Sequence, residues 1–263
     1  MWGPVLHLTQ VALLAVGPSS ATADDIIAQY VKRIGGMEKI QAVTTLRRTG
    51  KFTSPSGREA IVVRENKRPG KVREEYSLQG MTEINAYDGA TGWKVAPFQG
   101  KKEPEALSEE EMKVIVEDSD FDDPLIRYQE KGNKVEPLGK DDVEGTDTYK
   151  LKVTLKNGDV RYYFMDAESY VPIKIETQRM IRGAEQEFET WLGDYKEVAG
   201  WYLPYAVESG VKGSDNRSKI TYDKIEANVS IDDRRFEQPG TPPGKASPPP
   251  APHSGNTPLH HED

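Results

Sequence analysis

Histidine and cysteine, the side chains that most often act as catalytic bases, nucleophiles or metal ligands, are missing from the centre of this 263-residue sequence. There is no cysteine, and the four histidines are His7, His253, His260 and His261. Ser–His and Cys–His catalysis need such a histidine, and zinc and most transition metals prefer these two ligand types. The sequence therefore predicts no metal site and no cofactor between the two ends of the chain.

Carboxylates are the remaining candidates for chemistry, because the chain has 43 Asp and Glu residues. Asp118, Asp120, Asp122 and Asp123 have a spacing similar to that of calcium ligands, but the run lacks the glycine and the later glutamate of a calcium-binding loop. We interpret the run as a cap for a helix that begins at Pro124. No pair of carboxylates stands out, so we predict that the protein is not an enzyme; a hydrolase with a carboxylate mechanism stays an alternative.

The charge of the chain argues against nucleic acid as a partner. The formal net charge is −8 and the pI is about 5.3, so the scattered Lys and Arg produce no basic field that would attract phosphates. Hydrophobic residues make up 36% of the chain, which is enough for one core. The last segment, 237–263, is rich in Pro, Gly, Ser and His, and we predict that it is a disordered Pro-rich tail.

The N-terminus predicts export. An apolar run from Val5 to Val16 is too short to span a bilayer and is followed by Ala21-Thr22-Ala23, an A-x-A site for signal peptidase. We therefore predict that residues 1–23 are a signal peptide and that the protein is periplasmic, without stable membrane insertion. The run has no preceding Lys or Arg, so a buried first helix is the alternative. Without cysteine the mature chain has no site for lipid anchoring.

Helical spacing marks two parts of the chain. Asp24 and Asp25 can cap a helix that ends at Gly35-Gly36, and a short helical turn covers 37–42. In mid-chain, Ser108 and Glu111 form a capping box ahead of apolar residues on one helical face, and a second helix is expected from Pro124 to Gly132. We interpret the two mid-chain helices as a lid on a sheet.

The rest of the chain alternates between apolar and polar residues, as strands do. Tyr149, Leu151 and Val153 point to one face, and Asn157-Gly158 is a strong hairpin signal. Regular spacing of short strands favours an antiparallel barrel or a large curved sheet of about 11 strands. The expected strands are 44–54, 58–67, 71–79, 81–88 and 92–98. The strand pattern resumes near Lys134 and continues to the Asn157-Gly158 hairpin, and further strands are expected at 160–165, 171–181, 184–195, 201–211 and 216–226.

The stretch from Lys67 to Phe98 contains an ordered set of short motifs. They are a Lys-Arg-Pro turn, an Asp-Gly hairpin, a Trp and a Pro-Phe pair, here Lys67-Arg68-Pro69, Asp88-Gly89, Trp93 and Pro97-Phe98. In this order and spacing they resemble the signature of the periplasmic outer-membrane lipoprotein carriers, the LolA-like family. The segments 156–160 and 200–204 look like the lipoprotein-sorting branch of that family, and the resemblance covers about 24–236.

The resemblance implies an α+β fold: an unclosed antiparallel half-barrel over 24–236, with an N-terminal helix and a helical lid over a concave apolar face. Acyl chains would enter between sheet and lid. By position, Arg68 is the family's arginine that holds the lid shut. The carriers have a Trp where this chain has Glu74, which alters the expected cavity lining. The candidate cavity and signature residues are Pro69, Trp93, Pro97, Phe98, Tyr162, Phe164, Met112 and Ile115.

The function implied is a soluble periplasmic carrier that binds acyl chains of lipoproteins or lipids and passes them towards the outer membrane. Its expected partners are lipidated proteins or lipids, with an inner-membrane donor complex and an outer-membrane acceptor as further candidates. We expect a monomer. Two further alternatives are a lipid-sensing module for envelope stress with the same fold, and a structural β protein that fills its concave face with its own side chains.

Overall fold

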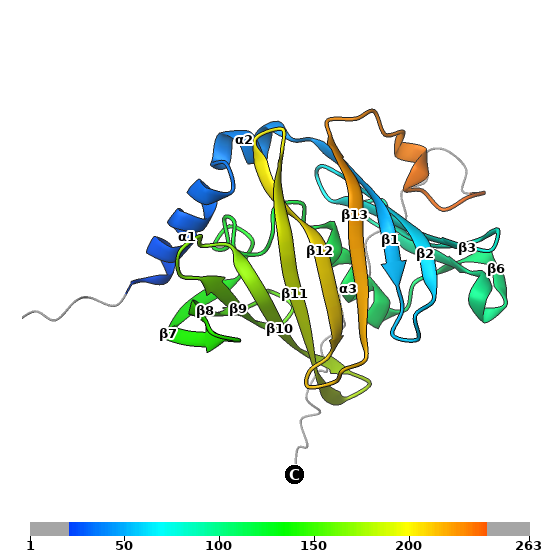
Figure 1. The fold of residues 1–263 in the computed structure, drawn as a ribbon. Coiled ribbons are helices and arrows are strands. Elements are labelled where there is room, and N and C mark those ends of the chain that lie inside the picture. Colours follow the sequence, from blue (N-terminus) through cyan, green and yellow to red (C-terminus); the bar gives the residue numbers. More distant parts are fainter. Residues whose placement is uncertain (1–20, 241–263) are drawn as a thin grey trace, which may run out of the picture.

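The computed structural model describes residues 21–240, which form one 13-stranded antiparallel sheet and a few helices (Figure 1). The helices are α1 (Ala23–Arg33), α2 (Met37–Ala42), α3 (Glu109–Ser119) and the 3-10 turns η1 (Pro97–Gln99) and η2 (Asp233–Arg235). The strands are β1 (Thr45–Thr53), β2 (Glu59–Lys67), β3 (Lys71–Leu78), β4 (Met81–Tyr87), β5 (Gly92–Ala96), β6 (Lys101–Ala106), β7 (Lys134–Val143), β8 (Thr146–Thr154), β9 (Val160–Asp166), β10 (Pro172–Ile181), β11 (Ala184–Val198), β12 (Trp201–Val211) and β13 (Arg217–Ala227).

The sheet consists of two meanders, β1–β6 and β7–β13, that are joined where β1 pairs with β13. Gly50 lies at this join, beside a shift in register, and a Cβ at its position would lie only 2.1 Å from the carbonyl oxygen of Thr221. The two end strands are β6 and β7, which do not pair with each other, so the barrel is unclosed. This confirms the predicted half-barrel.

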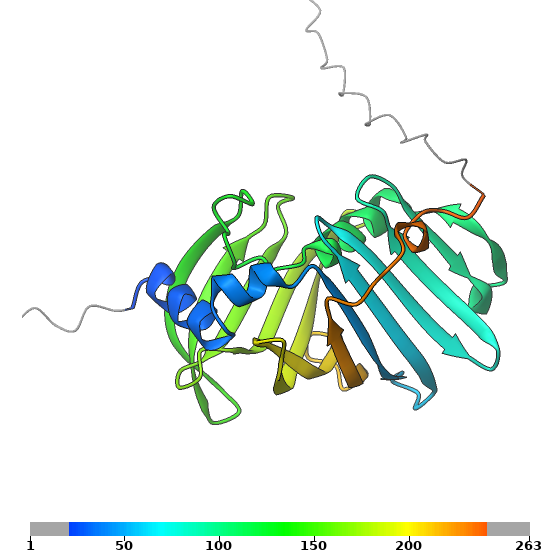
Figure 2. The same cartoon turned by 90° about the horizontal axis from the view of Figure 1, so that it is seen from above.

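The core lies on the concave side of the sheet, where α1, α2 and α3 are found (Figure 2). Alternate residues of each strand point into this core. Leu151, Val153 and Leu155 are buried there, as the sequence predicts. The N-terminal helix contributes Ile26, Tyr30 and other apolar residues at helical spacing. The core is therefore shared between the sheet and α1, α2 and the connection that follows α3.

The N-terminal capping residue is as predicted for α3 and differs from the prediction for α1. Ser108 caps α3 in a capping box with Glu111, as predicted. The cap of α1 is Thr22, with Asp25 in the capping box, so the prediction that Asp24 and Asp25 cap this helix is wrong. The Thr22 hydroxyl accepts a hydrogen bond from the backbone N–H of Asp25, the third residue of the helix. The Asp25 carboxylate in turn accepts one from the backbone N–H of Thr22, so Asp25 lies inside the helix and Thr22 is its cap.

Three details of the mid-chain region differ from the prediction. The helix expected from Pro124 to Gly132 is a series of turns, because Asp123 and Arg127 have left-handed φ angles of 73° and 52° that interrupt a right-handed helix. Strand β6 was not expected. Pro97 and Phe98 form the 3-10 turn η1 rather than the end of a strand, since Pro97 cannot donate a ladder hydrogen bond.

Within residues 21–240 no helix has the length and apolarity needed to cross a membrane. Most of the predicted signal peptide and most of the predicted Pro-rich tail, residues 1–20 and 241–263, lie outside the described residues. Ala23 is already the first residue of α1, so cleavage after Ala23 would remove the Thr22 cap.

Candidate functional site

Helix α3 bridges the two meanders across the concave side of the sheet. At its C-terminal end, the carbonyl oxygen of Asp118 accepts hydrogen bonds from Arg64 (3.1 Å) and Asn66 (3.3 Å) of β2. On the other side, Glu117 pairs with Arg161 of β9 and Arg179 of β10. The helix and the connection 120–133 together form a cover, which we call the lid, over the middle of the half-barrel.

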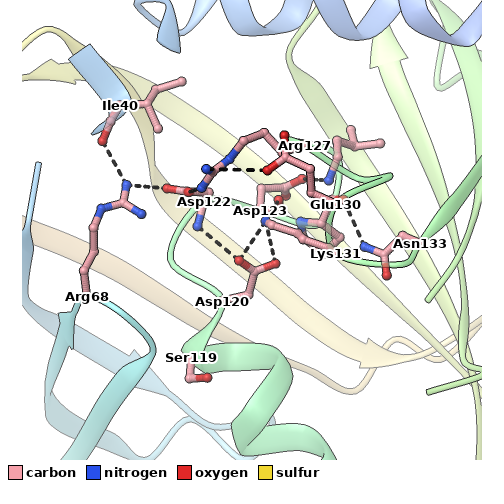
Figure 3. Close-up of polar contacts among 12 residues, drawn as sticks. Ile40, Arg68, Ser119, Asp120, Asp122, Asp123, Arg127, Glu130, Lys131 and Asn133 are labelled. Carbon is pink, nitrogen blue, oxygen red and sulfur yellow. Dashed lines mark hydrogen bonds and ion pairs between the residues drawn. The ribbon is translucent and has the colours of Figure 1, made fainter. Parts of the chain in front are cut away.

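Arg68, at the turn after β2, contacts both the lid and α2 (Figure 3). Its guanidinium donates to the carbonyl oxygens of Val43 (2.8 Å) and Ile40 (2.9 Å) and forms an ion pair with Asp122 of the lid. It also lies 4.2 Å from the ring centre of Phe121, within the range of a cation–π contact. One planar side chain thus connects α2, the sheet and the lid.

The acidic run 118–123 is engaged by basic side chains. Besides Arg68, the Asp122 carboxylate accepts from Arg127 at 3.0 Å, and Asp120 accepts from Lys131 at 2.7 Å (Figure 3). The Asp122 side chain is only 3% exposed. Burial opposes its ionisation, but the hydrogen bonds from Arg68 and Arg127 and the charges of Arg68 and Lys131 outweigh burial and lower the pKa of Asp122.

The lid borders two cavities of different character. An open groove of about 590 Å³ runs between α3, the connection 120–133 and the β8–β9 hairpin, and its apolar lining includes Met112, Val116, Pro124 and Leu155. We call it the groove. Beneath the lid is a smaller polar cavity of about 230 Å³, which we call the chamber. Glu117, Asp120 and Pro124 line both, so the two cavities adjoin.

The chamber shows that the concave face is not apolar throughout. Arg48, Arg64 and Arg161 lie in its wall, together with Tyr195 and Trp201 of the sheet. A third pocket, of about 420 Å³, opens between the ends of β1–β4 and η1, where Phe52 and Tyr76 pack edge to face with their ring centres 5.1 Å apart. Charged and aromatic side chains therefore both face the concave side of the sheet.

Comparison with known proteins identifies the architecture. No protein-family model and no curated protein matches the sequence. Among solved structures, a putative outer membrane lipoprotein-sorting protein domain from Vibrio parahaemolyticus matches with a TM-score of 0.56 at 14% identity, covering 81% of this chain and 97% of that one. A LolA superfamily protein from Nitrosomonas europaea matches with a TM-score of 0.54 at 12% identity, covering 83% and 98%. This chain has the LolA superfamily fold.

In this LolA-like structure, the predicted site residues do not lie together in one site. Met112 lines the groove, whereas Ile115 of the same helix is 7% exposed and lies outside the groove lining. Pro69 borders a small cavity of about 190 Å³ beside the C-terminal end of α3. Phe98 lines the third pocket and is 41% exposed, while Pro97 precedes it in η1.

Three aromatic residues expected in the cavity lie on the outer, convex face instead. Tyr162 and Phe164 alternate with Tyr163, whose hydroxyl donates to Asp123 of the lid, so they point away from the core. Phe164 is covered by Lys150 and Lys174, at 4.7 Å and 5.4 Å from its ring centre. The expectation that these two residues line the cavity is wrong.

Trp93 is covered on the convex face by the C-terminal segment 229–240. Its Nε1 donates to the carbonyl oxygen of Phe236 (2.7 Å), and Phe236 is fully buried. In the same layer Arg235 pairs with Glu65 (2.6 Å) and Glu75 (2.9 Å). Trp93, a candidate cavity or signature residue, is thus a core residue of the outer layer, on the face of the sheet opposite the lid.

Sequence reasoning did not find the arginines of the chamber or the C-terminal segment's contacts. Glu117, Arg161 and Arg179 meet across 44 and 62 residues of sequence, and no local pattern reports such a pairing. One signal was available: Arg48 and Arg64 stand at positions of their strands where alternation predicts the core face, and a charge there is unusual.

Proposed function

We propose that this protein is a soluble periplasmic carrier that binds acyl chains of lipoproteins or lipids in the groove and passes them towards the outer membrane. The observation that carries the proposal is the apolar groove of about 590 Å³ beside α3. Its volume is within the range of roughly 300–1,000 Å³ that is typical of small-molecule sites. Each methylene buried there contributes about 0.8 kcal/mol, so burial of about six would contribute roughly 5 kcal/mol.

The arrangement around the groove supports carriage rather than permanent binding. The groove is open at one side. Its α3 wall has only Ile115 and Ser119 buried, whereas the turns of the connection 120–133 are packed into the core by Leu125 and Ile126 and are also held by ion pairs. A carrier must release its load, and a wall that can move at moderate cost allows this. In this proposal Arg68 is the latch that keeps the lid closed.

The cellular setting is part of the same proposal. The predicted signal peptide would deliver the chain to the periplasm, and the cargo would be lipidated proteins or lipids. The name of the similar Vibrio structure, a lipoprotein-sorting domain, is consistent with such a cargo. The protein would act as a monomer that takes its load from an inner-membrane donor and delivers it to an outer-membrane acceptor.

The groove can be tested with two matched substitutions on α3. Val116 lines the groove and is 43% exposed, whereas Val114 is 37% exposed and lies outside the groove lining. Val116→Asp should weaken the binding of a diacylglycerol with a fluorescent acyl chain by roughly tenfold or more, because a carboxylate would be desolvated by the bound chain. Val114→Asp should bind as the wild type does.

Fluorescence titration would measure both affinities, and native mass spectrometry would show whether lipid co-purifies with the protein. Circular dichroism is the folding control, since both variants add one charge to the same helix. Equal affinity of Val116→Asp and wild type would place the acyl site elsewhere, and no binding by any form would argue against a carrier.

A further inference from the structure

Two arginines stand side by side on the concave face of the sheet. Arg48 of β1 and Arg64 of β2 are direct partners in the antiparallel register, and both line the chamber. Like charges at directly opposite positions of a sheet are destabilising, more so when they are removed from water. The pair is therefore costly unless negative charges offset both arginines.

Arg64 has carboxylate partners and Arg48 has none among the described residues. Arg64 lies 3.6 Å from Glu74, its pairing partner on β3, and 3.4 Å from the Asp118 carboxylate of the lid. The only bond from the Arg48 guanidinium within residues 21–240 is to the neutral amide oxygen of Asn66, at 2.7 Å. Burial lowers the pKa of Arg48 to about 10, so it remains charged at neutral pH.

The acidic residues of the chamber do not neutralise Arg48, because each has another partner. Glu117 is bound by Arg161 and Arg179, and Asp120 by Lys131. Asp123 accepts from the Leu125 backbone N–H (2.8 Å) and from the Tyr163 hydroxyl (3.3 Å).

The opposite wall of the chamber adds a further unused donor. Arg161 Nε is buried and has no hydrogen-bond partner among the described residues. The chamber wall therefore contains a second arginine whose donors the surrounding protein does not fully satisfy.

We propose that the chamber binds the single anionic head group, a carboxylate or a phosphate, of an amphiphile whose acyl chain occupies the groove. This inference rests on the proposed function and names the class of ligand within it: acidic amphiphiles rather than neutral acylglycerols. The two cavities adjoin at Glu117, Asp120 and Pro124, so one molecule can reach both when the lid shifts. The planar guanidinium of Arg48 suits a bidentate contact with either anion.

The test compares head groups on one acyl chain. Dodecanoate, dodecyl phosphate and dodecanol would compete at pH 7.5 with a fluorescent acyl probe for wild-type protein, Arg48→Met and Lys51→Met. Lys51 is the control because it is a cation on the same strand that pairs with Glu59 at the exposed end of the sheet. Inorganic phosphate and acetate form a separate arm, which distinguishes a free anion from a head group.

Wild type and Lys51→Met should bind the two anionic amphiphiles roughly 10- to 100-fold more tightly than dodecanol, the range expected for hydrogen bonds from a charged donor. Arg48→Met should lose this preference and keep its affinity for dodecanol. Its melting temperature should not fall, because the substitution removes a desolvated charge.

Equal affinities for all three probes in wild type would overturn this inference and leave the acyl site intact. Arg48→Met with an undiminished preference would overturn it as well. Failure of every dodecyl compound to bind would instead contradict the proposed function. If inorganic phosphate binds in an Arg48-dependent way and the dodecyl anions show no preference over dodecanol, the chamber is a site for a free anion, and the head-group assignment is wrong.

Discussion

Asp122 and Asp123 are neighbours in the lid with opposite electrostatic surroundings. Asp122 has two arginine partners, and its pKa is lowered. Asp123 has a tyrosine hydroxyl and a backbone N–H as partners, and burial raises its pKa from 3.8 to about 6. The ionised form of Asp123 is thus a local source of instability at neutral pH.

The difference at Asp123 predicts a pH dependence of stability. Between pH 3.8 and about 6 the folded protein binds more protons at Asp123 than the unfolded protein, so this group lowers the free energy of unfolding as pH rises. Asp123→Asn should remove that loss, because the amide can keep both hydrogen bonds and tolerates the left-handed backbone. We expect the variant to gain about 1 to 3 kcal/mol over wild type at pH 7 and little at pH 3.5.

Thermal unfolding of both proteins between pH 3.5 and 7.5 would measure this gain. Other carboxylates, Asp122 among them, titrate in both proteins, so the difference between the two curves isolates residue 123. A gain that is constant across the whole range would contradict the assignment.

At the scale of elements, the lid is attached through ion pairs and hydrogen bonds and through Leu125 and Ile126, which are buried in the core. The α3 end is attached to both meanders through Asp118 and Glu117, while the connection 120–133 is attached to α2 and the turn after β2 through Arg68. The connection has no regular hydrogen-bond ladder of its own. Its position should therefore respond to the loss of a single side chain.

Arg68→Leu should bias the lid open while the fold survives. A hydrogen bond from a charged donor contributes roughly 1.5–3 kcal/mol, enough to change the ratio of closed to open forms by about one to two decades. Binding of a hydrophobic dye to the empty protein should increase, and cargo should be transferred poorly. Arg68→Lys should restore the wild-type behaviour only in part, because lysine lacks the planar fork.

Arg127→Leu is the matched control, since Arg127 shares Asp122 but is more exposed and makes no bond to α2 among the described residues. Its dye binding should lie closer to wild type, with circular dichroism confirming that all variants fold. If Arg68→Leu and wild type bind the dye equally and transfer cargo equally, Arg68 is not a latch.

At the scale of the whole molecule, different segments of the chain lie against the two faces of the sheet. The N-terminal helices and the lid lie over the concave face, and the segment 229–240 contacts β2, β3 and β5 on the convex face. Lys67 contributes to the second layer by donating to the carbonyl oxygen of Ile231 and pairing with Asp233, both at 2.8 Å. The folded unit therefore extends to Phe236.

This boundary predicts opposite results for two changes at the C-terminus. Removal of residues 238–263 should leave the melting temperature nearly unchanged, because the segment has few apolar residues that could dock. Phe236→Ala should cost about 3–5 kcal/mol, the usual range for a fully buried phenylalanine. Thermal unfolding would compare both with wild type, and a drop of more than a few degrees for the truncation would show that the tail packs on the domain.

The sequence by itself determined the elements whose signals are local. Alternation placed Leu151 and Val153 in the core, the Ser108–Glu111 pair began α3, and Asn157-Gly158 made a hairpin, since each depends on residues two to four positions apart. These signals, together with the turn and hairpin motifs of 67–98, were sufficient to predict a LolA-like half-barrel.

Only the tertiary structure decided which face of the sheet each strand residue occupies and what covers it. Alternation says that Tyr162 and Tyr163 face opposite ways, but not which face is concave, because that depends on the curl of all 13 strands. The Trp93–Phe236 contact spans 143 residues and the Arg179–Glu117 contact 62, and such pairings form only after the sheet has brought its two meanders together. The chamber, with Arg48 opposite Arg64, results from that same long-range register.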